Sequence, residues 1–145
     1  AHVFNQMLAS RVRGGEWNAI APGDVCMLHG SRSFFTCDDV GEDIRARAVA
    51  GDVHPGLPLW GRGAPAMARC RELLACLPDE CRDICEFLEA SALELSWRPA
   101  RLLPDEFCWQ YGTDKTLRLD FALGAGSYAT AVLAEFVQYK EGRVE

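Results

Sequence analysis

A change in the spacing of apolar residues between positions 117 and 138 constrains the fold of this chain more than any other feature. From Leu117 to Leu123, apolar residues alternate with polar or small ones, as in a strand with one buried face. Gly124 and Gly126 follow, and glycine allows the backbone angles of a tight turn. From Tyr128 onward the apolar residues take up helical spacing. The stretch therefore predicts a strand, a glycine turn and a helix in succession, within a mixed α+β fold.

The start of this predicted helix is a candidate binding site. Ser127 stands where an N-cap is expected, with its hydroxyl accepting a hydrogen bond from a backbone N–H of the first turn. Tyr128 follows directly, so free N–H groups and an aromatic ring are expected together at one edge of a sheet. Such a place suits an anion beside a flat ring. We therefore predict that Gly126, Ser127 and Tyr128 bind a ligand; the alternative is a core tyrosine at a helix start.

Helical and strand patterns alternate through the rest of the chain. Helices are expected over residues 4–12, 65–77 and 78–88, with a further short one that ends at Val49. Strands are expected over residues 25–28, around 34–35, and over 107–111, the last paired with 117–123 in an antiparallel hairpin. Residues 51–64 hold four glycines and two prolines and are predicted to be the longest irregular stretch. Trp60 is interpreted as its anchor in the core, with stacking on a base as the alternative.

The charge of the chain limits where a nucleic acid could bind. The formal net charge of −6 over 145 residues argues against a general nucleic-acid-binding surface. Acid is concentrated in residues 71–100, which hold seven Asp/Glu and three Lys/Arg, a net charge of −4. The acid lies in a segment from Arg71 to Trp97 that is expected to be helical and to face away from RNA phosphates. No apolar stretch approaches the roughly 20 residues that span a bilayer, and no signal peptide opens the chain, so we expect a cytoplasmic protein without a membrane partner.

The cysteines and His29 are interpreted as structural residues. Seven cysteines include no Cys-x-x-Cys pair, and several of them lie in predicted helices, where a free cysteine behaves as a small buried apolar residue. A zinc site around Cys81 and Cys85 is the alternative, but the spacing of a tetrahedral site and a nearby histidine are missing. We therefore predict neither a metal nor a disulfide. His29 shows no carboxylate or cysteine partner in the sequence and is interpreted as a lone histidine.

Short motifs in a fixed order give the chain a family resemblance. The run Gly126-Ser127-Tyr128-Ala129-Thr130, followed by Val132-Leu133 and Glu135, resembles the last motif of the TruD family of tRNA pseudouridine synthases. Further motifs similar to that family are Phe4-Asn5-Gln6, Gly23-Asp24-Val25, Gly30-Ser31 with Phe34, His54-Pro55 and Pro58-Leu59-Trp60-Gly61. They occur in the family's order over most of the chain, which is far more specific than any one of them.

The resemblance implies an isomerase that converts a uridine in tRNA to pseudouridine without a cofactor. It implies that Tyr128 packs against the substrate uridine. The family's essential aspartate lies in a Gly-x-Lys-Asp-Arg motif that this sequence lacks, so no catalytic residue is assigned. Asp114-Lys115 has the reverse order and lies in a predicted turn. The chain is therefore interpreted as a C-terminal fragment that is inactive on its own. Its expected partners are tRNA and the missing N-terminal catalytic half of the same protein.

The same resemblance gives a domain interpretation. Residues 1–103 are expected to form the second half of the TruD insertion domain. Residues 104–145 are expected to form a C-terminal strand–loop–helix segment, a β-hairpin–helix piece of the catalytic core. Three positions depart from the family pattern: Ala134 replaces an arginine, Gly124 replaces a proline, and Gly56-Leu57 replaces a hydroxyl residue and glycine. The alternatives are a non-catalytic module that grips RNA or a protein, and a structural fragment with exposed apolar surface.

Overall fold

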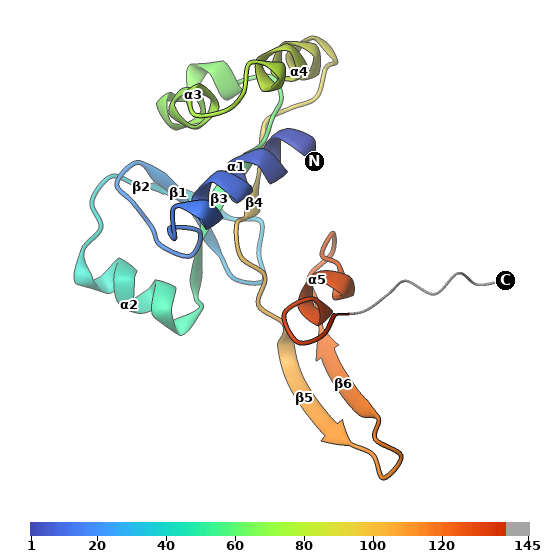
Figure 1. Cartoon of the computed structure of the whole chain (residues 1–145). Helices are drawn as coiled ribbons and strands as arrows, with labels where there is room; N and C mark the ends of the chain where they lie inside the picture. The colour runs from blue at the N-terminus through green and yellow to red at the C-terminus, as the bar shows by residue number, and fades with distance from the viewer. Residues whose placement is uncertain (139–145) are drawn as a thin grey trace, which may run out of the picture. The chain divides into compact units, whose positions relative to one another are not determined.

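The computed structural model describes residues 1–138 and has the predicted mixed α+β composition (Figure 1). The chain divides into two compact units, Ala1–Arg101 and Leu102–Glu145, and residues 139–145 of the second lie outside the described part. The first unit holds a four-stranded sheet and most of the helices, whereas the second holds a two-stranded hairpin and a short helix. Each unit is described by itself below.

The sheet of the first unit is antiparallel between all neighbouring strands. Its strands are β1 (Asp24–Leu28), β2 (Phe34–Cys37), β3 (Val53–Leu59) and β4 (Ser96–Pro99), in the order β2-β1-β3-β4. A five-residue loop, 29–33, joins β1 to β2, and Leu28 N–H donates to the carbonyl of Ser33 at its end, 3.0 Å away. The helix α2 (Glu42–Ala50) then carries the chain past β1 to the far side of that strand, where β3 pairs with it.

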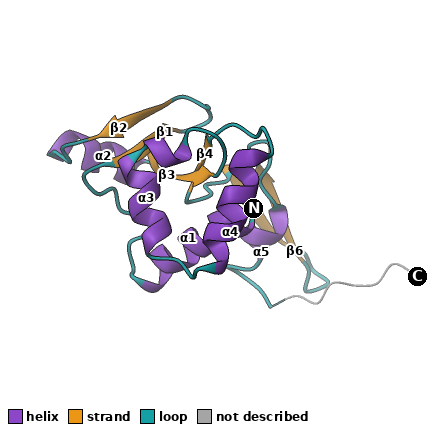
Figure 2. Ribbon diagram, turned by 90° about the horizontal axis from the view of Figure 1, so that it is seen from above, coloured by secondary structure: helices purple, strands orange, loops and turns teal. Residues whose placement is uncertain are grey.

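The remaining helices of this unit enclose the core. They are α1 (His2–Arg13), α3 (Ala68–Ala75) and α4 (Glu80–Ala90), with the short 3₁₀ helix η1 (Ala64–Ala66) before α3. Figure 2 shows these three α-helices close together, on the opposite side of the unit from α2 and β2. Each carries an apolar stripe, and the stripes together with β1 and β3 bury one continuous cluster of side chains.

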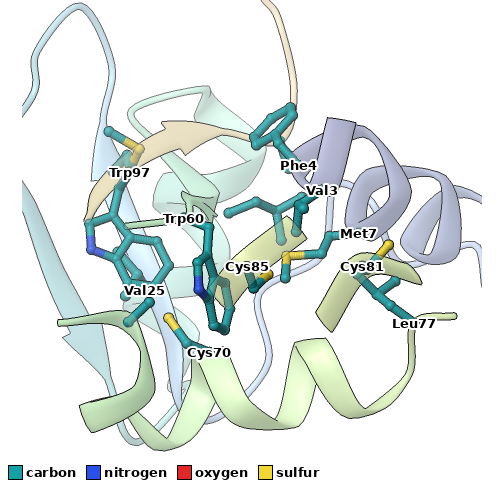
Figure 3. Close-up of a cluster of buried hydrophobic side chains, with 14 residues drawn as sticks. Val3, Phe4, Met7, Val25, Trp60, Cys70, Leu77, Cys81, Cys85 and Trp97 are labelled. Atoms are coloured by element: carbon teal, nitrogen blue, oxygen red, sulfur yellow. The ribbon is translucent and has the colours of Figure 1, made fainter. Parts of the chain in front are cut away.

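Trp60 occupies a central place in this core, as predicted. It is 6% exposed and lies among Val25, Cys70 and Cys85 in the close-up of the cluster (Figure 3). Its indole Nε1–H donates to a carboxylate oxygen of Glu89 at 2.7 Å, so the polar edge of the ring is satisfied while the rest is buried. The alternative role of Trp60 as a base-stacking residue is therefore incompatible with its position.

The prediction of an irregular segment over residues 51–64 was wrong. Residues 53–58 are all buried in β3, the second interior strand of the sheet, between β1 and β4. Pro55 and Pro58 lack a backbone N–H, and this argued against a strand. The neighbouring strands supply enough pairing to override this local preference; for example, Ala100 N–H donates to the Pro55 carbonyl at 2.8 Å. The acidic helical segment also ends earlier than predicted, because α4 stops at Ala90 and Trp97 lies in β4.

The second unit confirms the predicted hairpin. Strands β5 (Asp105–Tyr111) and β6 (Leu117–Ala122) pair antiparallel, with Trp109 opposite Leu119 and a register shift between Asp105 and Cys108. The helix that follows, α5, covers only Ala129–Leu133, shorter than the apolar spacing to Val137 predicted. Within residues 102–138, Val132 alone is fully buried, so this unit has almost no core of its own.

Candidate functional site

The segment from Gly124 to Tyr128 forms the predicted glycine turn, but its cap differs from the prediction. Gly126 has a φ of +84°, in the left-handed region that favours glycine. Ser127 N–H donates to the Gly124 carbonyl at 3.1 Å and closes the turn. The N-cap of α5 is Tyr128, with extended backbone angles, and no side chain caps the helix. The predicted N-cap role of Ser127 is therefore wrong: the turn continues one residue further than the sequence pattern indicated.

The side chain of Tyr128 is open to solvent. Its exposed fraction is 69%, so it is not a core tyrosine within the described residues. The helix that follows has only five residues, which is too short for the helix dipole to form an effective anion site at its N-terminus. The expected binding of an anion by free N–H groups therefore loses its physical basis. What remains at this position is an accessible aromatic ring directly after a hydrogen-bonded glycine turn.

The hairpin of β5 and β6, which precedes this turn in the chain, presents one apolar and one polar face. The register places Trp109 opposite Leu119 and Tyr111 opposite Leu117, and these four side chains share one face. Trp109 and Tyr111 are 62% and 71% exposed, and their rings contact edge to face with centroids 5.4 Å apart. Nearer the base of the hairpin, aromatic rings cover one another: the Phe107 ring stacks on those of Phe121 and Phe136.

The opposite face of the hairpin is polar. Cys108, Gln110, Arg118 and Asp120 alternate with the apolar residues along the two strands. Arg118 donates from Nε and Nη2 to the two carboxylate oxygens of Asp120, at 2.8 and 2.9 Å. A face that is polar and internally paired suits water, whereas the face with two exposed aromatic rings leaves apolar area uncovered. The polar face is thus stable in water, whereas the apolar face would be stabilised by a partner that covers it.

A buried histidine at the start of β3 connects three parts of the first unit. His54 is 2% exposed, and its Nδ1 accepts a hydrogen bond from Arg101 Nε–H at 2.7 Å. Its Nε2 lies 2.8 Å from Nδ1 of His29, in the loop between β1 and β2. Arg101 also donates from Nη2 to the carbonyls of Ala48 and Val53, at either end of the α2–β3 turn. His29 is therefore not the lone histidine that the sequence suggested.

This hydrogen-bond chain fixes the protonation state of His54. Arg101 can only donate, so Nδ1 of His54 carries no proton and the single proton of the neutral ring sits on Nε2, donated to His29. The pKa of His54 is lowered to about 4, chiefly by burial and also by the charges of Arg101 and His29, whereas Asp52 opposes the change. A second proton on His54 would have to displace the arginine. The arrangement holds one tautomer and one orientation of each ring.

A buried carboxylate joins the helices α1 and α3 to the sheet. Asp24, 1% exposed, accepts hydrogen bonds from both Nη atoms of Arg11 at 3.0 and 3.1 Å and from Arg69 Nε at 2.8 Å. The backbone N–H of Ala21 donates to it as well, at 2.8 Å. All of its oxygens are thus engaged by two cations and an amide, which is the geometry of a structural ion-pair network and not of a proton-transferring group.

Comparison with known proteins places the chain in a family. The family model of tRNA pseudouridine synthase D (TruD) matches residues 1–136. The chain is 40% identical over 144 residues to a protein named tRNA pseudouridine synthase D from Methylococcus capsulatus, and 36% identical over 143 residues to the one from Nitrosococcus oceani. The one from Pseudomonas aeruginosa is 37% identical over 139 residues. The chain belongs to the TruD family.

These alignments cover nearly the whole chain but only part of each relative. They include 96%, 97% and 94% of this chain, and 40%, 40% and 39% of the three relatives, in the order given. The chain thus spans about two fifths of the length of the TruD proteins that it matches. Its two lysines, Lys115 and Lys140, are followed by Thr116 and Glu141, so no Lys-Asp pair occurs in this sequence.

The cysteines of this TruD chain are free thiols, and five of them are buried in the first unit. Burial raises the pKa of Cys70 to about 11 and that of Cys85 to about 12, with further contributions to Cys85 from Glu89 and Cys81. Such thiols stay protonated at neutral pH, and a thiol must lose its proton to bind a metal. Within residues 1–138, no group of three or more His, Cys, Asp or Glu side chains is arranged to hold a metal ion. In the same range, no helix is long and apolar enough to cross a membrane.

Sequence reasoning found Gly126, Ser127 and Tyr128 but missed the chain from Arg101 through His54 to His29. The three predicted residues are consecutive in the chain, within and directly after the glycine turn. The pair His54-Pro55 had served only as a motif of the resemblance. A histidine next to a run of buried residues was the available signal, but the arginine lies 47 positions away in sequence, and no local pattern links the two.

Proposed function

We propose that this chain is the C-terminal part of a tRNA pseudouridine synthase, in which Tyr128 stacks on the target uridine and the turn formed by Gly126 and Ser127 positions its ring. The catalytic aspartate, in this proposal, belongs to an N-terminal half of the same protein that this chain does not include. Residues 1–103 then form the second half of the insertion domain, and 104–145 a β-hairpin–helix piece of the catalytic core. Seven free thiols suit the reducing cytoplasm as the compartment.

The observation that carries the proposal is the family match over residues 1–136 combined with an exposed tyrosine ring at the family's last motif. Stacking on a base needs an accessible flat ring, and Tyr128 is 69% exposed. Stacking also costs less entropy when the backbone that carries the ring is held in place. The hydrogen bond from Ser127 N–H to the Gly124 carbonyl restrains the backbone directly before Tyr128. The aspartate motif that the resemblance makes essential for isomerisation does not occur in this sequence, which supports a second, catalytic portion.

The uncovered face of the hairpin supports the need for that second portion. A two-stranded hairpin is at best marginally stable in water, and this one exposes Trp109 and Tyr111 on its apolar face. The relatives named tRNA pseudouridine synthase D are about two and a half times as long as the part aligned here, since the alignments cover about 40% of them. We infer that the remaining portion of the protein covers this apolar face and completes a catalytic domain.

Mixing the two portions tests the proposal. The 145-residue chain, the N-terminal portion of the same protein, and an equimolar mixture are each incubated with an unmodified tRNA transcript, and pseudouridine is quantified. We expect product from the mixture alone. Replacing Trp109 by Ser should weaken the association of the two portions, whereas Cys108→Ser, on the polar face, is the matched control. Product from the chain alone would overturn the assignment of the catalytic aspartate to the other portion.

A non-catalytic module that grips RNA or a protein is the rival function. The same mixture decides between the two, because a module of that kind would associate with its ligand and leave the yield of pseudouridine unchanged. A mixture that associates but forms no pseudouridine, with an N-terminal portion of verified sequence and fold, would favour the rival and overturn the isomerase proposal.

A further inference from the structure

The loop between β1 and β2 in the first unit combines an exposed aromatic ring with an unpaired cation. Phe34, at the start of the edge strand β2, is 52% exposed. Its inner side rests on the buried Trp97, with ring centroids 6.1 Å apart at an angle of 48°. Arg32, two residues earlier, is exposed, and within residues 1–138 its guanidinium has no ion-pair or hydrogen-bond partner. A supported ring and a free positive charge therefore lie on one short stretch of chain.

We propose that this loop and Phe34 contact a single-stranded segment of RNA, with Phe34 stacking on an unpaired base and Arg32 on a neighbouring phosphate. This inference rests on the proposed function, because that function makes RNA the substrate. A base in a duplex has both faces covered by its neighbours, so a ring on the protein surface can stack only on an unstacked base. Trp97 holds the Phe34 ring in place, which reduces the entropy that stacking would cost.

The charge around the loop favours phosphate despite the acidic chain. The nearest acids along β2 are Asp38 and Asp39, just after the other end of the strand, and Asp38 is four positions along the chain from Phe34. At ~3.3 Å a residue this is ~13 Å, beyond the screening length of ~8 Å at physiological salt. Asp52, next to β3, is neutralised by Arg47 at 2.6 Å. Arg32 is thus left as a net positive charge at the loop.

A second aromatic side chain of the same unit offers a matched contrast. Phe87 on α4 is 70% exposed, more than Phe34, but Asp83 and Glu86 lie on the same helix close to it. Their negative charges repel a phosphate backbone. If exposure alone decided the contact with RNA, Phe87 would be the better site. The charge of the neighbours instead singles out Phe34.

The end of the loop farther from Phe34 is held by the hydrogen bonds that link Arg101, His54 and His29. His29, the first loop residue, is bound by the buried His54, which Arg101 orients in turn. The backbone N–H of His29 also donates to the carbonyl of Asp52 at 2.9 Å. At the other end, the Ser31 hydroxyl accepts from Ser33 N–H at 3.0 Å. Hydrogen bonds therefore restrain the loop at both ends, and a preformed loop loses less conformational entropy when it binds a ligand.

Binding of labelled oligouridine of about ten nucleotides to the 145-residue chain, measured by fluorescence anisotropy, tests the inference. We expect Phe34→Leu to weaken binding about tenfold, Phe34→Tyr to retain it, and Phe87→Leu to leave it unchanged. Leucine keeps an apolar contact with Trp97 but cannot stack, so the Leu and Tyr variants separate stacking from folding, which melting temperatures monitor. Arg32→Gln should lower the slope of log Kd against log salt by about one, and an RNA duplex should bind more weakly than oligouridine.

Equal affinities of the Phe34→Leu and Phe87→Leu variants would overturn the inference, as would failure of the unaltered chain to bind oligouridine. Self-association of the chain that Phe34→Leu abolishes would also overturn it, because the ring would then be covered by a second copy. Pseudouridine formation by the mixture of the two portions is measured on the same samples. If the mixture is active while the two variants bind alike, the loop inference fails and the proposed function stands. If binding follows the Phe34 ring but no pseudouridine forms, the proposed function fails.

Discussion

Acidification is expected to destabilise the first unit through His54. In the folded chain the pKa of this histidine is lowered to about 4 from an ordinary 6.5, chiefly because the ring is buried. Below pH 6.5 the unfolded chain therefore takes up a proton on His54 that the folded chain does not. The stabilisation by the neutral ring is complete above pH 6.5 and is lost as the pH falls toward 4. The pKa difference corresponds to about 3 kcal/mol, a large part of the 5–15 kcal/mol by which a typical domain is stable.

Urea unfolding at a series of pH values between 4 and 7 measures this loss. Tryptophan fluorescence reports the unfolding of the first unit, since Trp60 and Trp97 are buried there. Carboxylates also titrate in this range, so the quantity of interest is the difference between the unaltered chain and a variant. His54→Gln removes the titrating ring and is expected to be less stable at pH 7 but to lose about 3 kcal/mol less on acidification.

The matched control is the exposed His2, at the start of α1. His2→Gln is expected to leave the pH dependence of the unfolding free energy unchanged. If His54→Gln and His2→Gln showed the same loss of stability between pH 7 and pH 4, His54 would not be held neutral by its surroundings, and the hydrogen-bond chain from Arg101 would not exist in solution.

Three further perturbations follow from the structure. In the mixture of the two portions, Tyr128→Phe should keep most single-turnover activity. Tyr128→Ala should lose roughly 1–3 kcal/mol of stacking, a deficit of about ten- to a hundredfold in kcat/KM, with an unchanged melting temperature. An alanine variant that unfolds, but whose folded fraction is fully active, would show that Tyr128 is only a packing residue. Asp24→Asn leaves the buried Arg11 and the half-buried Arg69 without their carboxylate and should lower the free energy of unfolding by about 3–5 kcal/mol, against an effect near zero for the exposed Asp79→Asn. Gly61→Ala should cost about 1–3 kcal/mol in urea unfolding, because an added Cβ would lie 2.5 Å from the Leu93 carbonyl oxygen; Gly14→Ala, where the nearest atom is 3.6 Å from the added Cβ and φ is −78°, is the control without the clash.

Local patterns in the sequence were sufficient where local forces decide the structure. The alternation of Leu117, Leu119 and Phe121 produced a strand of the hairpin, and the turn after Tyr111 joined it to its partner as predicted. The left-handed Gly126 was expected because few other residues adopt that conformation at low cost. The amphipathic helix that begins before Phe4 ends at Gly14, as its pattern indicated. In each of these cases the signal and the structure lie within a few residues of each other.

The failures came from interactions between distant residues. Pro55 and Pro58 are poor strand residues, yet β1 and β4 on either side hold them in a buried strand. The N-cap was placed at Ser127 on composition alone, whereas a hydrogen bond to the Gly124 carbonyl draws its backbone into the preceding turn. For the candidate site, sequence pattern identified Tyr128, and its exposure is a property that only the folded chain reveals.

The contrast between the two units indicates why an active enzyme would need more chain than this. The first unit buries a large apolar cluster around Trp60, satisfies its buried carboxylate with two arginines and orients its buried histidine. The second unit, within residues 102–138, buries only Val132 fully and leaves Trp109 and Tyr111 on an open face. A hairpin with so little core cannot hold a catalytic geometry to within a fraction of an ångström unless another part of the protein packs on it. Tyr128 follows that hairpin in the chain. In the proposed function, stacking by Tyr128 therefore depends on the same packing that would bring a catalytic aspartate to the uridine, so we expect the loss of either portion to abolish the reaction.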